Sequence, residues 1–392
     1  MKKNICVITG TRAEYGVLKN LLKNIKDDNQ LELQLIITGM HLSPEFGLTY
    51  KIIEKDGFEI KDKIEILLSS DTDNGINKAI GLGMISFSES YSRLKPDMVI
   101  VLGDRYEILA ATIAAYILKI PIAHISGGDI TEGAYDDAFR HSITKMAYLH
   151  FPGTESSRKR IIQLGEAKER VFNFGDVGVE NITKVKLYSK KELTERLNIR
   201  LEKKYFLVVM HSTTLDLLET QKQIKNLIKS LIKLKDYNFI FIKGNSDTNG
   251  REINSLIEEF YKKNIDKVSI FTSLSIEEYL SLLKNSEGLV GNSSSGIIEA
   301  PSLEVLSLNI GERQRGREQA STTINCGISE EEITKGLEEL VKRKRKLGEE
   351  KIVNPYKSEN TSEKIVETIK EYLFDKKKIN LKKTFNDINF KY

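Results

Sequence analysis

Ionisable side chains are dense in one stretch of the sequence, HISGGDITEGAYDDAFRHSITK at residues 124–145. Asp136 and Asp137 stand where a helix is expected to begin, and each has a basic partner four residues later, Arg140 and His141. A carboxylate that faces a histidine and an arginine is a usual arrangement for proton transfer near neutral pH. Helix capping and a surface ion pair would explain one aspartate but not the whole cluster. The stretch therefore predicts general acid–base chemistry.

Two more candidates for proton transfer follow predicted strands. Asp104 comes directly after the apolar run MVIVLG at 98–103, so it is either the N-cap of the next helix or a general acid or base. His211 ends the apolar run FLVVMH at 206–211. A single histidine is more often structural, but its place at the carboxyl end of a strand favours a role in a site.

A serine-rich segment, GNSSSGIIEA at residues 291–300, follows a strand and opens a helix. Hydroxyl groups and the free backbone N–H groups of a helix start are donors that suit a diphosphate. Glu299, one turn into the helix, could bind both hydroxyls of a ribose, and Pro301 is expected to keep the helix short or kinked. Capping alone would use one serine, so the segment predicts an anion site. Its serines are Ser293, Ser294 and Ser295.

Two arginines also follow predicted strands, Arg12 in GTRAEYG and Arg313 in NIGERQRGRE. A guanidinium at a strand end, beside the start of a helix, can pair with a phosphate. For Arg12 a surface position in a tight turn is an equally good interpretation. For Arg313 the competing interpretation is a solvated run of charges.

The elements that must position these residues alternate between short apolar runs and longer helical patterns, which predicts a wound α/β sheet. The pattern runs through two rounds, separated by a charged linker. We expect an α/β protein with two Rossmann-like domains facing each other across a cleft, and chemistry outside the carboxyl ends of the strands. The expected strands are residues 4–10, 33–39, 98–103, 120–125, 148–151, 206–211, 239–245, 268–274, 288–292 and 305–311.

The expected domain limits follow from this change of pattern. The first domain spans residues 1–176 and the second spans residues 177–360. A helix at about 361–375 is expected to join the first domain. The lysine-rich tail, residues 376–392, is expected to be solvated or packed against a partner.

Composition and missing motifs exclude several classes of protein. The 392 residues have 60 basic and 56 acidic side chains, and a net charge of +4 is small for a nucleic-acid binder. No apolar run reaches the roughly 18 residues that span a bilayer, and no signal peptide is recognised, so a cytoplasmic protein without membrane contact is expected. Two cysteines, Cys6 and Cys326, exclude a disulfide framework. Phosphate-loop, GxGxxG, HExxH and GxSxG motifs are missing or misplaced.

In this order, the motifs resemble the UDP-N-acetylglucosamine 2-epimerase family, specifically its hydrolysing branch. The resemblance runs from TRAEYG at 11–16, through GDRYE, GGDITEGAYDDAFRHSITK and GNSSSG, to GERQRGRE at 311–318. Non-hydrolysing relatives begin GTRPE and carry an HxEAG segment, whereas Ala13 replaces that proline here and the GGD segment is shorter. The resemblance implies the GT-B arrangement of two Rossmann-like domains, with the second one binding the nucleotide, and a homodimer or homotetramer.

Residue roles follow from the same resemblance. Many relatives have Glu at the position of Ser126, and since a serine is no carboxylate base, Asp129 is the expected substitute. The positions that match catalytic residues, or lie close to them, are Asp104, Asp136, His211, Asp129, Asp137 and His141. The expected UDP-binding residues are Arg12, Arg105, Asn245, Asn292, Ser293, Ser294, Gly296, Glu299 and Arg313.

The implied reaction converts UDP-N-acetylglucosamine and water to N-acetylmannosamine and UDP, for sialic-acid-type sugars. Loss of UDP and of the carbon-2 proton gives a glycal, to which water adds, so neither a redox cofactor nor a metal is needed. The alternative substrate is UDP-N,N'-diacetylbacillosamine, the precursor of legionaminic-type acids. The polar groups of His41, Ser43 and Glu45 could bond to sugar hydroxyls, which favours UDP-N-acetylglucosamine.

Two other functions are compatible with the same motifs. A GT-B glycosyltransferase would need an acceptor and would keep the configuration at carbon 2. A catalytically idle nucleotide-sugar sensor would bind UDP without turnover, but the ionisable cluster at 124–145 argues against it.

Overall fold

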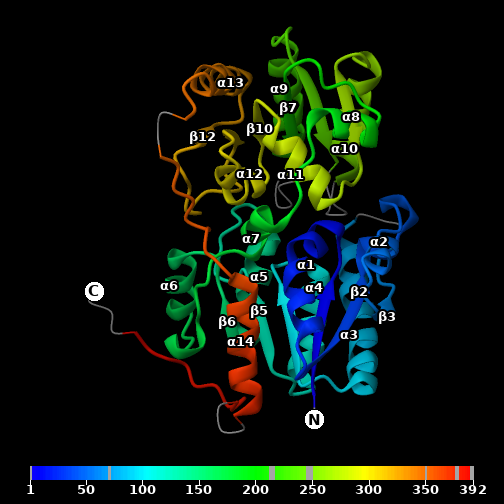
Figure 1. Ribbon diagram of the computed structural model, residues 1–392, viewed down its shortest axis with the longest axis vertical. Helices are drawn as coiled ribbons and strands as arrows, with labels where there is room; N and C mark the ends of the chain where they lie inside the picture. Colours follow the sequence, from blue (N-terminus) through cyan, green and yellow to red (C-terminus); the bar gives the residue numbers. More distant parts are fainter. Residues whose placement is uncertain are drawn as a thin grey trace. The chain divides into compact units, whose positions relative to one another are not determined.

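The computed structural model describes residues 2–68, 72–211, 217–243, 250–348, 351–375 and 379–388 (Figure 1). Contacts divide the chain into two compact units. Unit 1 comprises residues 1–129, 136–181 and 356–392, and unit 2 comprises residues 130–135 and 182–355. The domain limits and the cleft expected from the sequence stay predictions.

Unit 1 contains a six-stranded sheet with the order β3-β2-β1-β4-β5-β6. All neighbouring strands are parallel, and the central strand β4 is buried along its whole length, which explains its uninterrupted apolar sequence. The strands are β1 (Lys3–Thr9), β2 (Leu31–Thr38), β3 (Ile60–Ile64), β4 (Met98–Leu102), β5 (Ile122–Ile125) and β6 (Leu149–Phe151).

Helices cover both faces of this sheet. One core joins the sheet to α1 (Arg12–Asp27) and α14 (Thr361–Phe374), which pack against each other. The other core joins it to α3 (Asp73–Leu94) and α4 (Tyr106–Ile117). The remaining helices and turns are α2 (Tyr50–Lys55), α5 (Tyr135–Met146), α6 (Glu155–Gln163), α7 (Val177–Lys184), η1 (Gly39–Leu42), η2 (Pro44–Phe46) and η3 (Lys168–Arg170).

Unit 2 repeats the plan with a second parallel sheet, in the order β12-β11-β10-β7-β8-β9. Its strands are β7 (Tyr205–Val209), β8 (Asn238–Ile242), β9 (Val268–Phe271), β10 (Gly288–Gly291), β11 (Ser307–Ile310) and β12 (Thr323–Cys326). Its helices and turns are α8 (Lys190–Leu197), α9 (Leu217–Ile232), α10 (Gly250–Lys263), α11 (Ile276–Lys284), α12 (Ser295–Ile298), η4 (Ala300–Leu303) and α13 (Glu330–Lys344).

The two sheets have the same topology. Counted in chain order within each unit, the strands run 3-2-1-4-5-6, the order of the Rossmann fold. The direction of winding reverses between β1 and β4 in unit 1 and between β7 and β10 in unit 2. Ligands of such sheets bind beyond the carboxyl ends of the strands at this switch point.

The C-terminal segment lies on unit 1. Lys383 donates to the carbonyls of Lys145 and Ala147 and to the carboxylate of Glu166, and the Asn386 backbone N–H donates to the Gly165 carbonyl. Within the described ranges, no helix is both long and apolar enough to cross a membrane.

Candidate active site

The first strand end of unit 1 carries Arg12 as the first residue of α1. Thr11 is the N-cap, and its hydroxyl accepts a hydrogen bond from the Glu14 backbone N–H over 3.2 Å. The Glu14 carboxylate returns to the loop, where it accepts from the N–H groups of Gly10 at 2.7 Å and Thr11 at 3.3 Å. This reciprocal capping box fixes the loop from which Arg12 projects.

Arg105, at the end of β4, is enclosed by carboxylates. Its Nη2 donates to Glu107 Oε1 over 3.1 Å, and its Nε lies 3.9 Å from Glu14 Oε1. Glu107 is fully buried. Burial raises the pKa of Glu14 to about 7; the Arg105 charge opposes this rise and Glu107 adds to it. The charge of this group therefore changes near neutral pH.

Asp104 faces α5. Arg140 donates to its carboxylate, so the ends of β4 and α5 are tied by an ion pair. The interpretation of Asp104 as a helix N-cap is wrong, because α4 begins at Tyr106 and Arg105 holds the N-cap position. Asp104 pairs with the Arg140 guanidinium instead.

The first turn of α5 presents the predicted cluster. Asp136 is buried, and the Asp137 Oδ2 lies 3.6 Å from Nε2 of His141, which confirms that pair. The pKa of His141 is lowered, mainly by burial and also by the positive charges of Arg140 and Arg160, while Asp137 opposes the shift. A neutral imidazole at pH 7 can accept a proton.

Asp129 lies in a second buried carboxylate pair. Its Oδ1 accepts from the Ser157 hydroxyl over 2.5 Å, and its charge helps burial to raise the pKa of Asp176 to about 6. Ser126, the residue in place of the relatives' Glu, donates to Asp176 over 3.4 Å. Asp129, the expected substitute base, is thus buried beside another acid, Asp176.

Unit 2 supplies the other half of the predicted residues. His211 follows β7 and Asn292 follows β10, at the switch point of the sheet. The side-chain amide of Asn292 bonds to both the N–H and the C=O of His211. Arg313 follows β11 and donates from Nη1 to the Asn292 carbonyl over 3.4 Å. Asn245, also expected to bind UDP, lies outside the described residues.

The serine segment forms a short helix, as Pro301 predicts. α12 has four residues, Ser294 is its N-cap without a side-chain capping bond, and η4 follows directly. Ser295 accepts from the Tyr279 hydroxyl over 2.6 Å, and its N–H bonds to the Ser293 hydroxyl over 3.3 Å.

Two other members of the expected nucleotide site border this helix. Gly296 lets the helix pack closely on β11, since a Cβ there would stand 3.1 Å from the Cβ of Ser307. Glu299 ends the helix, and its charge adds to burial in raising the pKa of Tyr279.

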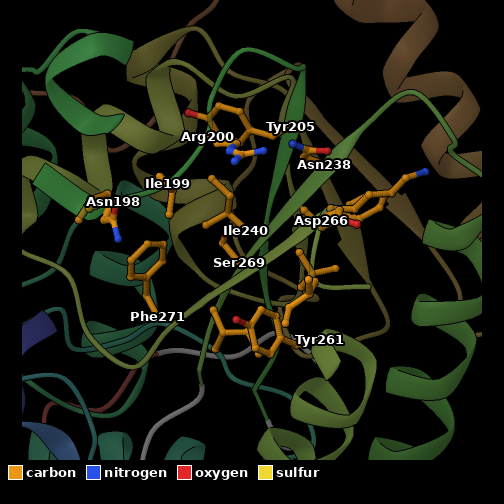
Figure 2. A pocket seen from close by; sticks show the side chains of 16 residues that line it. Asn198, Ile199, Arg200, Tyr205, Asn238, Ile240, Tyr261, Asp266, Ser269 and Phe271 are labelled. Atoms are coloured by element: carbon orange, nitrogen blue, oxygen red, sulfur yellow. The ribbon is translucent and has the colours of Figure 1, made fainter. Parts of the chain in front are cut away.

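A separate cavity of about 520 Å³ opens beside the first residues of β7 and β8 and along β9 (Figure 2). Arg200, Asn238 and Asp266 are polar residues of its lining, and Ile240 and Phe271 are apolar ones. None of the predicted site residues lines this cavity. Among the described residues, no group of three or more His, Cys, Asp or Glu is arranged to hold a metal ion.

A family model described as UDP-N-acetylglucosamine 2-epimerase matches residues 23–370. The chain belongs to this family. A Campylobacter jejuni protein named GDP/UDP-N,N'-diacetylbacillosamine 2-epimerase (hydrolyzing) is 44% identical over 84% of this chain and 85% of its own length. Escherichia coli polysialic acid biosynthesis protein P7 is 39% identical over 96% of both chains. These relatives confirm the resemblance to the hydrolysing branch.

Two further comparisons extend this result. A Legionella pneumophila UDP-N,N'-diacetylbacillosamine 2-epimerase (hydrolyzing) is 34% identical over 94% of this chain and 96% of its own. The crystal structure of UDP-GlcNAc 2-epimerase from Neisseria meningitidis, bound to UDP-GlcNAc, superposes with a TM-score of 0.77, covering 94% of this chain and 100% of that one at 21% identity. Together with the two six-stranded sheets, this confirms the GT-B-like α/β fold.

Three acids close to the predicted residues are not predicted from the sequence: Glu14, Glu107 and Asp176. Glu14 and Glu107 lie within the TRAEYG and GDRYE motifs, but their local pattern indicates only helix starts. Asp176 follows Gly175, a common helix-start pattern, and its neighbour Asp129 is far away in sequence. Only the fold brings Asp129 and Asp176 together.

Proposed function

We propose that this chain is a hydrolysing 2-epimerase whose substrate is UDP-N,N'-diacetylbacillosamine, converted with water to UDP and the free 2-epimeric sugar. The observation that carries this proposal is the 44% identity to the Campylobacter jejuni protein of that name over most of both chains. The Legionella pneumophila relative, with the same sugar in its name, supports it independently.

The structure also removes one reason for preferring UDP-N-acetylglucosamine. That expectation relied partly on His41 as a group that bonds to sugar hydroxyls. His41 is fully buried, with Nε2 at 3.1 Å from the Thr9 hydroxyl oxygen and Nδ1 at 2.8 Å from that of Thr49. Burial lowers its pKa to about 3, with the nearby Arg12 charge acting in the same direction. His41 is thus part of the core of unit 1.

The proposed reaction begins with departure of the nucleotide. The bond between carbon 1 and the diphosphate oxygen breaks, UDP keeps the electron pair, and a carboxylate takes the carbon-2 proton. The electrons of that C–H bond become the carbon 1–carbon 2 double bond of the glycal. Arg12, Arg105 and Arg313, with the hydroxyl and N–H donors of residues 293–296, would stabilise the leaving diphosphate, a contribution of a few kcal/mol.

Hydration completes the cycle. Water bonds through its oxygen to carbon 1 and gives up one proton to a carboxylate, and a protonated acid delivers a proton to carbon 2 on the face opposite to the one that lost it. Asp104 and Asp136 are the proposed acid and base, and His211, Asp129, Asp137 and His141 are further candidates for proton transfer. The enzyme needs neither a metal nor a redox cofactor, and we propose a cytoplasmic homodimer or homotetramer.

An NMR time course in heavy water tests the proposal. UDP-N,N'-diacetylbacillosamine and UDP-N-acetylglucosamine are incubated separately with the enzyme. We expect UDP and a free sugar carrying deuterium at carbon 2, with kcat/KM at least tenfold higher for the diacetylated substrate, a difference of about 1.4 kcal/mol. A product without deuterium at carbon 2 would falsify the elimination.

UDP-N-acetylglucosamine remains the second candidate, because the Escherichia coli relative named for polysialic acid biosynthesis is 39% identical over 96% of this chain. A tenfold preference for this sugar nucleotide in the same assay would establish it instead. The GDP-linked diacetylated sugar is included because the Campylobacter jejuni name gives both nucleotides. A glycosyltransferase would show turnover only with an acceptor sugar and would leave carbon 2 unlabelled.

A further inference from the structure

One buried amide joins two strand ends in unit 2. β7 and β10 are parallel neighbours, and Val209 pairs with Gly291 at their carboxyl ends. The residue directly after β10 is Asn292, which is 0% exposed. Its Oδ1 accepts from the His211 backbone N–H over 2.7 Å, and its Nδ2 donates to the His211 carbonyl over 2.9 Å. The amide therefore holds both polar backbone groups of His211.

The backbone of Asn292 is held as well. Its N–H donates to the Val209 carbonyl over 3.2 Å, and its carbonyl accepts from the side chain of Gln314 over 2.8 Å. Gly291 permits this close approach, because it has φ +138° and a Cβ there would lie 1.9 Å from the Val209 carbonyl oxygen. Each backbone and side-chain polar group of Asn292 thus has a protein partner.

We propose that Asn292 is a positioning residue that fixes the backbone of His211. The motif had suggested direct contact with UDP, but the amide is turned into the protein. This inference rests on the proposed function for the role of His211. His211 is the second residue after β7, where the sheet no longer fixes the chain. A displacement of about 1 Å in a reacting group can cost about 10²-fold in rate.

Asn292→Asp is the sharpest variant. The aspartate keeps an oxygen that can accept from the His211 N–H. Its second oxygen replaces the Nδ2 donor and faces the His211 carbonyl oxygen, while the side-chain volume is nearly unchanged. We expect kcat to fall about 10- to 100-fold while KM for the UDP-sugar changes less than about threefold. A raised KM or weaker UDP binding at unchanged kcat would overturn the proposal, since that result indicates direct contact with the nucleotide.

A double-mutant cycle separates positioning from general damage. If Asn292 acts through His211, then Asn292→Asp causes little further loss in a His211→Ala background. If the two substitutions lower kcat independently, so that their fold-losses multiply in the double variant, the proposal is contradicted. Asn309→Asp on β11 is the matched control: that buried amide donates to Asn325 Oδ1 over 2.9 Å, so the same change puts two oxygens together away from His211. We expect Asn309→Asp to lower the melting temperature but to leave kcat unchanged.

A spectroscopic measurement does not depend on turnover. The ring signals of His211 in protein labelled at histidine are assigned with His211→Gln and followed against pH. Asn292→Asp should shift these signals and their titration midpoint, whereas Asn309→Asp should not. Unchanged signals in folded Asn292→Asp would refute the inference, and absent turnover with every UDP-sugar in the wild type would refute only the proposed function.

Discussion

Arg105 shows how neighbouring acids can fix the position of a guanidinium. One guanidinium faces Glu107, which is fully buried, and Glu14, whose carboxylate also holds the N–H groups of Gly10 and Thr11. Glu107 Oε2 has no hydrogen-bond partner among the described residues. A guanidinium has five donors in one rigid plane, so it can hold two carboxylates in a defined geometry, whereas the ammonium group of a lysine has no such fixed plane.

Glu14→Gln should change how stability depends on pH. The folded-state pKa of Glu14, about 7, lies above its ordinary value of 4.5, so its stabilising contribution is complete below about pH 4.5 and is lost as pH rises through 7. Glutamine does not ionise but keeps an acceptor for the Gly10 N–H. We therefore expect the melting temperature of the variant to fall less than that of the wild type between pH 5 and 8. Glu65→Gln, at an exposed position, is the control, and parallel curves for Glu14→Gln and wild type would contradict the prediction.

Asp104→Asn and Asp136→Asn should each lower kcat by about 10²-fold or more, the usual scale for a lost general acid or base. Neither residue is assigned to the diphosphate, so the Kd of UDP, measured by calorimetry, should change little. The comparison with Asp137→Asn is informative because Asp137 pairs with His141. Near-normal kcat in Asp136→Asn would make Asp137 the better candidate.

At the scale of elements, the sequence predicts most clearly the strands that are buried on both faces of a sheet. β1, β4 and β7 appear as apolar runs because helices cover both faces of each sheet. β3 and β12 are not predicted from the sequence, because both are edge strands whose sequences, IKDKI and TINC, carry too few apolar residues to stand out.

The candidate site was predictable to the extent that it follows strand ends. Asp104, His211 and the GNSSSG segment lie beyond the carboxyl ends of strands that meet at the two switch points. Their partners were not predictable, because the pairing of Arg140 with Asp104 and of Asn292 with the His211 backbone depends on residues 36 and 81 positions apart. Local spacing also predicts Asp136 as a partner of Arg140, and that pairing stays a prediction.

The C-terminal segment should stabilise α5, the helix that carries this cluster. Glu166, 1% exposed, contacts Lys145, His150, Arg170 and Lys383. Lys383 also donates to the carbonyls of Lys145 and Ala147 at the C-terminal end of α5, where the helix dipole favours a positive charge. Lys383→Met should therefore destabilise the protein by about 1–3 kcal/mol, seen as a lower melting temperature. The control is Lys382→Met, at an exposed neighbour, and equal melting temperatures for the two variants would disprove this role.

At the scale of the whole molecule, the chain has two complete sheets of the same topology, each with its own buried cores. The predicted residues divide between them by chemistry. Unit 1 carries most of the carboxylates and His141, with Arg12 and Arg105, whereas unit 2 carries the serine segment, Glu299 and Arg313. Such a division predicts that UDP alone, without a sugar, is held largely by unit 2.

Thermal unfolding with UDP tests this division. At about 100 times its Kd, a ligand adds about 2.7 kcal/mol of stability, which for a unit of this size is about 5–10 °C. Arg313→Ala should roughly halve the shift at the same UDP concentration, because a lost charge-assisted bond weakens binding about tenfold or more. Arg315→Ala, whose exposed guanidinium pairs with Glu312 at 3.0 Å, should keep the full shift. Arg200→Ala probes the cavity beside β8: if this variant loses the shift and Arg313→Ala keeps it, the nucleotide binds in that cavity and not at the strand ends.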